Sequence, residues 1–280
     1  MPRATVADID AHTLCLNDSE TIRQSLISLI SNGVSKIVVV DGGSTDGSVG
    51  QISDLPIEVV VSPPGIQVQV SKAMAYMQKS YTFQGEADQT YNPDFLEMLL
   101  AELEVSGFDA IQARKFRSFG PGFFVKGQSL FHTINQPGPG LVDLISGPQL
   151  WRTSTLVAVL SEFSENSYSS DTSLAEILRE RGVRCGIGKT MTEEIGHLDY
   201  KSFLRRMRNY GIGDYHFFTK NWKRWSFSRR VSSVCHILKR YGVHYPLQAA
   251  KLGHPILGIT YFWMILIHRY YFWIRRALGG

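Results

Sequence analysis

Short apolar runs, separated by glycine, proline and polar residues, recur along the first two thirds of the chain. The run Ile37–Val40 consists of four β-branched residues and is followed by Asp41, Gly42 and Gly43. A run that short, bounded by glycines, is typical of a buried strand in a parallel sheet. The same criterion predicts further strands at His12–Leu16, Ile57–Val61, Tyr81–Gln84 and Ala110–Ala113.

Apolar residues spaced three and four apart lie between these strands, as on the buried face of a helix. They predict helices over Ile22–Ile30, Val70–Met77, Leu96–Leu103 and Leu174–Leu178. The third helix is expected to have Asn92 as its N-cap and Pro93 at its first position. Strands that alternate with helices predict an α/β fold with a mostly parallel, Rossmann-like sheet. The stretch Phe119–Pro148 is rich in glycine and proline, and we expect it to be a loop.

The composition is that of a globular protein. The chain has 280 residues and is 44% hydrophobic, which suits one large α/β domain or one domain with an appendage. Its three cysteines, Cys15, Cys185 and Cys235, show no CxxC spacing, which argues against a disulfide framework and a zinc site. The N-terminus has no apolar signal segment. We therefore expect a reducing, cytoplasmic setting.

Charge is distributed unevenly along the chain. Residues 1–200 hold 14 Lys and Arg against 24 Asp and Glu, a balance of −10. Residues 201–280 hold 15 Lys and Arg against a single acid, Asp214, a balance of +14. We therefore predict a catalytic domain over 1–200 and a basic, aromatic helical extension over 201–280. The extension is expected to face an anionic partner.

The most apolar segment of the extension is Pro255–Ile267, which has thirteen residues. A membrane-spanning helix needs about 20, so a helix lying on an anionic membrane surface is the better prediction. Arg269, Arg275 and Arg276 are then expected to meet lipid headgroups. Basic residues with aromatic neighbours also suit nucleic acid, but tryptophans suit a membrane interface equally, and no nucleic-acid partner is expected. The alternative is a buried helix that packs on the catalytic domain.

Candidate chemistry begins at the end of the strand Ile37–Val40. In open α/β sheets, ligands bind at the carboxyl ends of strands, where Asp41 lies. Gly42 and Gly43 allow a tight turn with no Cβ to obstruct a ligand. The alternative is an ordinary strand-to-helix turn in which an aspartate caps the backbone.

Two further acidic elements follow. Glu86 and Asp88 lie two residues apart at a strand end, and in an extended segment both carboxylates would face the same side. Such oxygen ligands suit Mg²⁺ or Mn²⁺ bridging a diphosphate; the alternative is a pair of solvated turn acids. Asp171 precedes a helical pattern, which places a second acidic element at the mouth of a helix; the alternative is that it is simply the N-cap of that helix.

Taken together, these elements resemble the family 2 inverting glycosyltransferases of GT-A fold. The resemblance covers Thr13 to His216. It rests on the ordered segments Leu16–Ile22, Val38–Ser48, Gly85–Leu99 and Ser169–Gly182. The second of these matches the family's nucleotide-binding turn, the third its DxD region, and the fourth the helix that carries its catalytic acid.

The resemblance implies a role for each matching residue. Asp41 would contact the base or ribose of a sugar nucleotide, with Asn17 and Glu20 near the same pocket and Gly43 and Ser44 in its turn. Gln69 and Lys72 stand where related enzymes contact the donor diphosphate. Asp88 would hold the divalent metal, Mg²⁺ or Mn²⁺, with Glu86 and His197 as further ligands. Asp171 would be the general base of a single displacement that inverts the anomeric carbon.

The resemblance therefore implies transfer of a sugar from a nucleotide-sugar donor to a saccharide or lipid-linked glycan, at the cytoplasmic face of a membrane. Glu86 and Ser170 depart from the family pattern, where Asp and often Glu stand. These departures favour the alternative of a catalytically silent module that binds nucleotide sugar or acts as a scaffold. A nicotinamide-dependent dehydrogenase is disfavoured because no GxGxxG follows the first strand.

Overall fold

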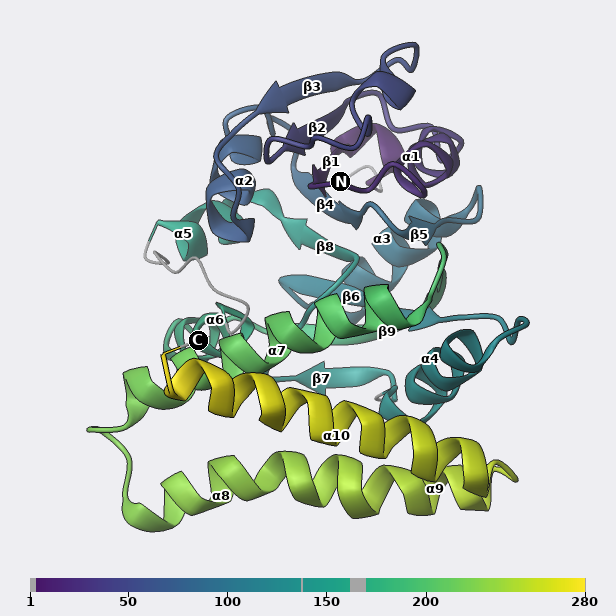
Figure 1. Ribbon diagram of the computed structural model, residues 1–280. Helices are drawn as coiled ribbons and strands as arrows, with labels where there is room; N and C mark the ends of the chain where they lie inside the picture. Colours follow the sequence, from purple (N-terminus) through teal and green to yellow (C-terminus); the bar gives the residue numbers. More distant parts are fainter. Residues whose placement is uncertain (1–3, 137, 162–169, 280) are drawn as a thin grey trace. The chain divides into compact units, whose positions relative to one another are not determined.

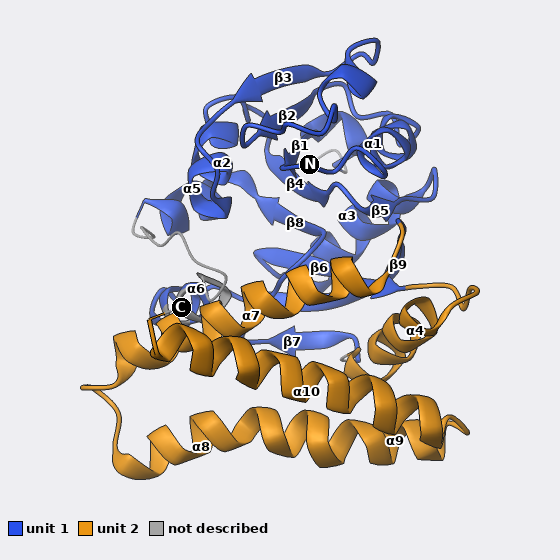
Figure 2. Cartoon of the chain, in the orientation of Figure 1, with its two compact units in different colours: residues 1–116, 137–166, 170–196 blue, residues 117–136, 167–169, 197–280 orange. Residues whose placement is uncertain are grey.

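A computed structural model describes residues 4–136, 138–161 and 170–279. The chain divides into two compact units, coloured blue and orange in Figure 2. Among the described residues, unit 1 comprises 4–116, 138–161 and 170–196, and unit 2 comprises 117–136 and 197–279. Unit 2 thus contains the predicted extension together with a segment from the middle of the chain.

Unit 1 is built on one sheet, to which the described residues contribute nine strands (Figure 1). The strands pair in the order β3-β2-β1-β4-β8-β6-β9-β5, and β7 also pairs with β9. β8 is antiparallel to both β4 and β6, so β3, β2, β1, β4, β6 and β9 all run in one direction. The predicted mostly parallel sheet is confirmed. The bounds are β1 Ile9–Cys15, β2 Ile37–Asp41, β3 Glu58–Val61, β4 Tyr81–Glu86, β5 Gln89–Thr90, β6 Ala110–Phe116, β7 Gly140–Val142, β8 Gln149–Arg152 and β9 Cys185–Glu194.

Helices cover both faces of this sheet. Alternate residues of β1 and β2 point to opposite faces, so Ala11 and Val39 pack with α1 (Ile22–Ile30) and α3 (Phe95–Ser106). Val38 and Val40 pack with α2 (Ile66–Met74) on the other face, which α5 (Thr153–Leu160) and α6 (Ser170–Glu180) extend. Full burial of one Leu, Ile or Phe side chain contributes about 1.5–3 kcal/mol. The helices therefore hold the strand ends in place. Two short 3₁₀ helices, η1 (Val6–Asp8) and η2 (Gly50–Ile52), complete the unit.

Two local predictions were wrong. Helix α3 begins at Phe95, and its N-cap position is Asp94 rather than Asn92. The Asn92 carbonyl instead accepts hydrogen bonds from Phe95 N and from the side chain of Asn32, so Asn92 and Pro93 form the turn before the helix. The stretch predicted as one loop, Phe119–Pro148, contains the helix α4 (Phe123–Asn135) and the strand β7. Its glycines lie between or within these elements rather than excluding them.

Unit 2 is a group of helices around its own apolar core. Leu130 of α4 is buried together with Phe203 and Met207 of α7 (Tyr200–Asn221) and with Tyr261 and Phe262 of α10 (Pro255–Ala277). The remaining elements are α8 (Phe227–Ile237), the π-helical η3 (Leu238–His244) and α9 (Tyr245–Lys251). The core joins residues 117–136 to residues beyond 200.

Helices α7 and α10 lie very close together. A Cβ placed on Gly211 of α7 would be 2.7 Å from the Arg269 carbonyl oxygen and 2.8 Å from Phe272 Cβ, both in α10. Asp214 accepts two hydrogen bonds of 2.8 Å from the Arg269 guanidinium. Burial opposes the charged guanidinium, but the bonds to Asp214 outweigh burial and raise the pKa of Arg269. The prediction that Arg269 meets lipid headgroups was therefore wrong.

Helix α10 continues for 23 residues, through the thirteen apolar residues that the sequence singled out and on to Ala277. One side of it, including Gly258, Tyr261, Phe262 and Ile265, is buried in the core of unit 2. Across the described ranges, every helix is too short or too polar to cross a bilayer.

His12 gives unit 1 a pH-dependent stability. It is fully buried in β1, and both ring nitrogens lack a polar partner among the described residues. Burial lowers the pKa of His12 from 6.5 to about 4. As the pH falls through 6.5, His12 therefore becomes protonated in the unfolded chain. In the folded chain it stays neutral until the pH approaches about 4. We expect the free energy of unfolding to fall by about 2 kcal/mol between pH 7.5 and pH 5 from this group alone.

Denaturant unfolding of the wild type and His12→Leu at both pH values tests this expectation. Leu keeps an apolar side chain of similar size and does not titrate, so the variant should lose less stability on acidification. An equal loss in both proteins would assign the acid sensitivity to other groups.

Candidate functional site

The carboxyl ends of β1, β2 and β4 lie next to one another. Because β1 runs parallel to both neighbours, Cys15 pairs with Asp41, and Leu14 pairs with Glu86. Gly42 N donates to the Cys15 carbonyl at 2.8 Å and so extends this register into the loop. The loops that follow the three strands therefore leave the same edge of the sheet.

A hydrogen-bonded chain joins the first two loops. Asn17 N donates to Ser44 Oγ at 2.9 Å, and Ser44 Oγ donates to Asp41 Oδ1 at 2.5 Å. The Asp41 carboxylate also accepts from Gly43 N at 3.0 Å, and Asn17 Oδ1 accepts from Thr45 N at 2.8 Å. Asn17 has a φ of +61°, a conformation that asparagine tolerates better than most residues. Sequence analysis predicted these residues but not that they bond to one another.

A second carboxylate reinforces the same loops. Asp46 accepts from Ser19 N at 3.0 Å, from Ser48 N at 3.1 Å and from Ser48 Oγ. Burial would raise the pKa of Asp46, but these hydrogen bonds outweigh it and lower the pKa well below its usual range. Ser48 Oγ in turn accepts from Asp18 N at 2.9 Å. The loop after β2 is thus fixed at both of its aspartates.

Gln69 on α2 has a structural position. The residue is 3% exposed, and its Nε2 donates to the carbonyls of Val40 at 2.8 Å and Cys15 at 3.1 Å. Gly42 passes directly over it, since a Cβ there would be 3.3 Å from the amide. Gln69 therefore holds the ends of β1 and β2 against α2. Its predicted contact with a donor diphosphate finds no support in this geometry.

The other residues that were predicted to contact the nucleotide sugar, Gly43, Glu20 and Lys72, are accessible to solvent. Gly43 is exposed at the turn with a φ of +90°, where a side chain would strain the backbone. Glu20 is exposed in the turn before α1, and Lys72 is exposed in the last turn of α2. Their contacts with a ligand remain predictions.

Glu86 and Asp88 do not lie on one extended segment, so that part of the prediction was wrong. Glu86 is the last residue of β4, and Ala87 and Asp88 form a turn that leads into β5. The turn is held because the Asp88 carbonyl accepts from Ile195 N at 2.8 Å. Ser25 Oγ donates to the Glu86 carbonyl at 2.9 Å. Both acids are half-buried.

Lys115 of β6 is a component that sequence analysis missed. Its Nζ lies 2.6 Å from Glu86 Oε2. Burial would lower the pKa of Lys115, but the charges of Glu86, Asp88 and Glu194 outweigh it, so the pKa is raised and the ammonium stays charged. A Cβ on Gly147 would be 2.2 Å from Lys115 Cε, so only glycine leaves room for this side chain. The basic pair Arg114-Lys115, directly after the predicted strand Ala110–Ala113, was the available signal.

The segment Glu86–Asp88, called the acidic turn below, offers some of the ligands that a divalent cation needs. Carboxylates are the donors that Mg²⁺ and Mn²⁺ prefer, and Mg²⁺ commonly takes one or two of them and completes its shell with substrate phosphates. Glu86 is engaged by Lys115 at 2.6 Å, and Asp88 Oδ1 accepts from Gln89 Nε2 at 3.3 Å, so a metal would share either carboxylate with its present partner. In the part of the chain that the structure describes, no three His, Cys, Asp or Glu side chains gather into a metal site.

The two remaining predicted residues lie elsewhere in the chain. Asp171 is the second residue of α6, so its backbone is at the start of a helix, as predicted. Its side chain lies outside what the structure describes. His197 belongs to unit 2, just before α7, near Asp199, which caps that helix by accepting from Ser202 N at 2.7 Å. The catalytic and metal-binding roles of these two residues stay predictions.

Comparison with known proteins agrees with this architecture. The family model described as Glycosyl transferase family 2 matches residues 11–157, which include the loops after β1, β2 and β4. Glycosyltransferase AglJ of Haloferax volcanii is 24% identical over 182 residues, which cover 62% of this chain and 59% of that protein. The chain thus spans less than two thirds of the length of this relative.

Solved structures share the fold. Glucosyl-3-phosphoglycerate synthase from Mycobacterium tuberculosis, in complex with Mn²⁺, UDP-glucose and phosphoglyceric acid, has a TM-score of 0.50 and 16% identity. The match covers 72% of this chain and 77% of that one. Residues 1–349 of S. aureus TarS, in complex with UDP-GlcNAc, have a TM-score of 0.50 and 14% identity, with 92% and 81% covered. The predicted GT-A fold is confirmed.

Proposed function

This chain belongs to glycosyl transferase family 2, and from that premise we propose that it moves a sugar from a nucleotide-sugar donor to a saccharide or lipid-linked glycan. The observation that carries the proposal is the meeting of three polar loops at the carboxyl ends of β1, β2 and β4. In α/β sheets this edge is where nucleotides bind. The names of the relative and of the solved structures support the same class of reaction.

The loops after β1 and β2 would bind the nucleoside. Asn17, Ser44 and Asp41 already bond to one another, so the loop needs little reordering when a ligand binds. Preorganised polar groups save the entropy of ordering them on binding. Exposed Gly43 would let a ligand approach the backbone, and Glu20 and Lys72 would lie at the margin of the site.

The acidic turn would hold the diphosphate. Bound Mg²⁺ or Mn²⁺ would act as a Lewis acid that stabilises negative charge on a departing diphosphate. Asp88 would be its ligand from unit 1, and Lys115 would keep Glu86 in place and add a positive charge beside it. Asp171 would accept the proton of the acceptor hydroxyl, so that one displacement at the anomeric carbon inverts its configuration.

A donor screen tests this function. The intact chain is incubated with a panel of nucleotide sugars, with Mn²⁺, with Mg²⁺ and with EDTA, and release of nucleoside diphosphate is measured. We expect release from one nucleotide class, dependent on metal. Release from none of the donors, with or without candidate acceptors, would contradict the proposal.

The second candidate is a silent module that binds nucleotide sugar without turnover. The engagement of Glu86 by Lys115 favours it, because this ion pair occupies a carboxylate that the metal would otherwise use. The two candidates differ in one measurement: a silent module would bind a nucleotide sugar in the presence of metal and leave it intact over hours.

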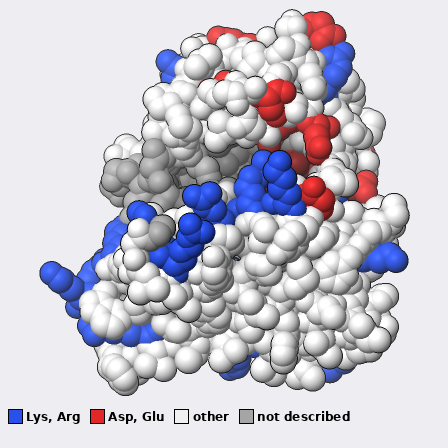
Figure 3. Space-filling model, viewed as in Figure 1, with Lys and Arg blue, Asp and Glu red and all other residues white. Residues whose placement is uncertain are grey.

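We also propose that unit 2 binds an anionic membrane surface. The outer side of α10 carries a continuous apolar stripe at helical spacing, which the core does not cover. The stripe consists of Ile256, Ile259, Trp263, Ile267, Tyr271 and Ile274, each about half exposed or more. Residues 201–280 carry a charge of +14, and Lys and Arg cluster over α7 in Figure 3. Apolar surface next to basic charge is the combination that binds anionic bilayers.

Binding to vesicles should be only partly reversed by salt. Each Lys or Arg near an anionic leaflet contributes about 1 kcal/mol, which salt screens, whereas burial of the stripe is insensitive to salt. Flotation with neutral and anionic vesicles, at low and high salt, measures both parts. The variant Trp263→Gln/Ile267→Gln should lose the salt-resistant part, while Val105→Gln, which changes an exposed apolar residue of unit 1, should not. A wild-type chain that floats with neither lipid would contradict the proposal.

A further inference from the structure

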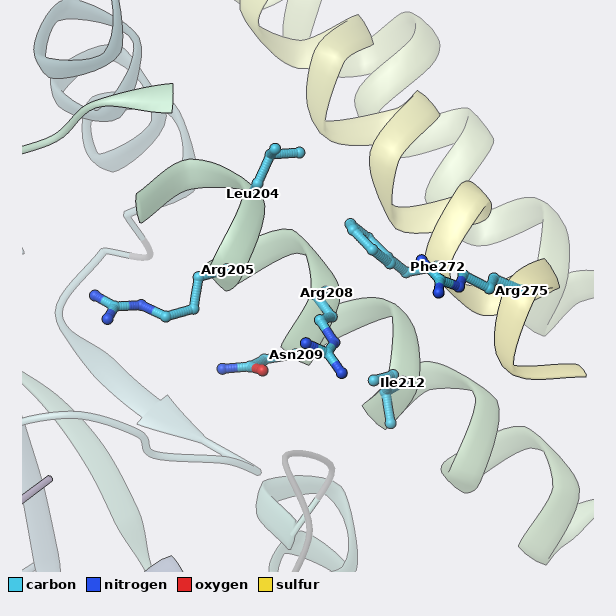
Figure 4. Close-up of a pocket in the computed structure, with 7 residues that line it drawn as sticks. All are labelled: Leu204, Arg205, Arg208, Asn209, Ile212, Phe272 and Arg275. Carbon is cyan, nitrogen blue, oxygen red and sulfur yellow. The ribbon is translucent and has the colours of Figure 1, made fainter. Parts of the chain in front are cut away.

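A pocket with an unusual charge lies between α7 and α10. It has a volume of about 380 Å³ and is lined by Leu204, Arg205, Arg208, Asn209, Ile212, Phe272 and Arg275. Figure 4 shows the Arg205 and Asn209 side chains on one side of α7, and the Arg275 guanidinium extending from α10 alongside Phe272. Three arginines therefore line one cavity that is large enough for a small ligand.

The shape of this pocket is set by the close contact between its two helices. Gly211 lets α7 approach the backbone of α10, and the Arg269–Asp214 ion pair joins the helices beside it. Neither contact involves the three arginines of the pocket. Arg205, Arg208 and Arg275 are therefore carried by two helices that are held together by other residues.

Their positive charge is not balanced within unit 2. The sequence of its described residues contains two acids, Asp199 and Asp214. Asp199 caps α7, and Asp214 pairs with Arg269. Arg205, Arg208 and Arg275 accordingly form no ion pair within the described ranges. Arg205, Arg208 and Arg275 are all exposed. Like charges on one surface repel one another, and an anionic ligand bound among them would reduce that repulsion.

The helix dipoles do not account for these arginines. A cation stabilises the last turn of a helix, which could explain Arg275 alone. Arg205 and Arg208 lie in the first half of α7, far from its C-terminal end at Asn221. The helix dipole therefore accounts for at most one of the three charges.

We propose that this pocket binds a phosphate group. The guanidinium is the side chain best matched to phosphate oxygens, which it can bind through two parallel hydrogen bonds. Asn209 offers a further polar group, and Leu204, Ile212 and Phe272 would contact the carbon atoms next to the phosphate. The phosphate would belong to a lipid headgroup or to a soluble phosphorylated compound. Only its identification as the acceptor rests on the proposed glycosyl transfer.

Calorimetric titration of the intact chain with inorganic phosphate, in EDTA and without donor, tests the site. The variant Arg205→Gln/Arg208→Gln/Arg275→Gln should bind phosphate at least ~10-fold more weakly than wild type. The control Lys223→Gln/Arg224→Gln/Lys239→Gln removes the same charge from exposed positions of unit 2 outside the pocket. Its affinity should change less than ~2-fold. Equal losses in the two variants would overturn the proposal.

Two further measurements complete the test. Replacing the three pocket arginines by lysine keeps the charge and removes the paired donors, so affinity should still fall. An unchanged affinity would overturn the proposed geometry, and the single variant Arg275→Gln gives a second test if the triple variants lose their thermal transition. Dihexanoyl phosphatidic acid in place of phosphate separates the two sources. Pocket-dependent binding of this lipid assigns a headgroup, and binding of phosphate alone assigns a soluble compound.

Failure of this proposal can be told apart from failure of the proposed function. Phosphate binding is measured without a sugar donor. If the pocket variant and the control variant lose the same affinity for phosphate, that result therefore says nothing about sugar transfer. A chain that binds phosphate in the pocket and releases no nucleoside diphosphate from any donor would contradict the glycosyltransferase proposal alone.

Discussion

Replacing Asp171 by Asn is expected to lower kcat by about 10²–10⁴-fold, the usual contribution of a general base. Asn has nearly the same shape and cannot accept the proton of an acceptor hydroxyl. The donor would still bind, because Asp171 is proposed to act on the acceptor. The measurement is the rate of sugar transfer beside the affinity for the nucleoside diphosphate, using the donor found by the screen.

The matched control is Glu180→Gln, which removes one negative charge from the exposed end of the same helix, α6. It should leave kcat within about twofold of wild type, as surface substitutions usually do. If Asp171→Asn keeps near-normal turnover, the base is another residue. Glu165 is the next candidate from the sequence, and it lies outside the described residues.

Asp88→Ala is expected to abolish the effect of divalent metal on donor binding and to reduce transfer by about 10²-fold or more. Changing a residue that merely supports a metal ligand costs about 10–100-fold, and Asp88 is proposed to be the ligand itself. A carboxylate and a diphosphate repel each other unless a cation lies between them. Titrations of UDP, GDP and CDP, with Mn²⁺ and with EDTA, measure this dependence in wild type and variant.

Glu97→Ala serves as the control, since Glu97 is an exposed acid on α3 that lies away from the acidic turn in sequence. Its metal dependence should equal that of wild type. If wild-type affinity is the same in Mn²⁺ and EDTA, the metal role is excluded. Lys115 would then become the main cation for a diphosphate, because its ammonium already lies beside Glu86 and Asp88.

The sheet was predictable from the sequence because its strands are almost pure apolar runs. Ile37–Val40 is buried on both sides, so every residue in it had to be apolar. The loop after this strand was predictable as well, because glycines and short polar side chains at a strand end are typical of a tight turn. The sequence did not show that Ser44 would connect Asn17 to Asp41, because that bond joins residues 27 positions apart.

Lys115 and Gln69 show why the rest was harder to predict. Gln69 has the polarity of a ligand-binding residue, yet its amide is buried against two strand ends. Lys115 resembles a surface residue in sequence, yet it reaches an acid 29 positions earlier, across the sheet. Such pairs depend on which strands become neighbours, and β8, inserted antiparallel between β4 and β6, could not be placed from periodicity. The helix α4 was missed because its flanking glycines suggested a loop.

The core of unit 2 combines helices that the ribosome makes at different times. Leu130 of α4 is buried against side chains of α7, α9 and α10, which lie far downstream in the chain. A ribosome adds about 5–20 residues per second, so α4 waits about 7–30 s between its own synthesis and that of α10. Until α7 has been made, the apolar face of α4 has no partner from its own unit, and α9 and α10 complete the core later. Nascent chains should therefore recruit chaperones as α4 emerges, and unit 2 can complete its core only after α10 has left the ribosome.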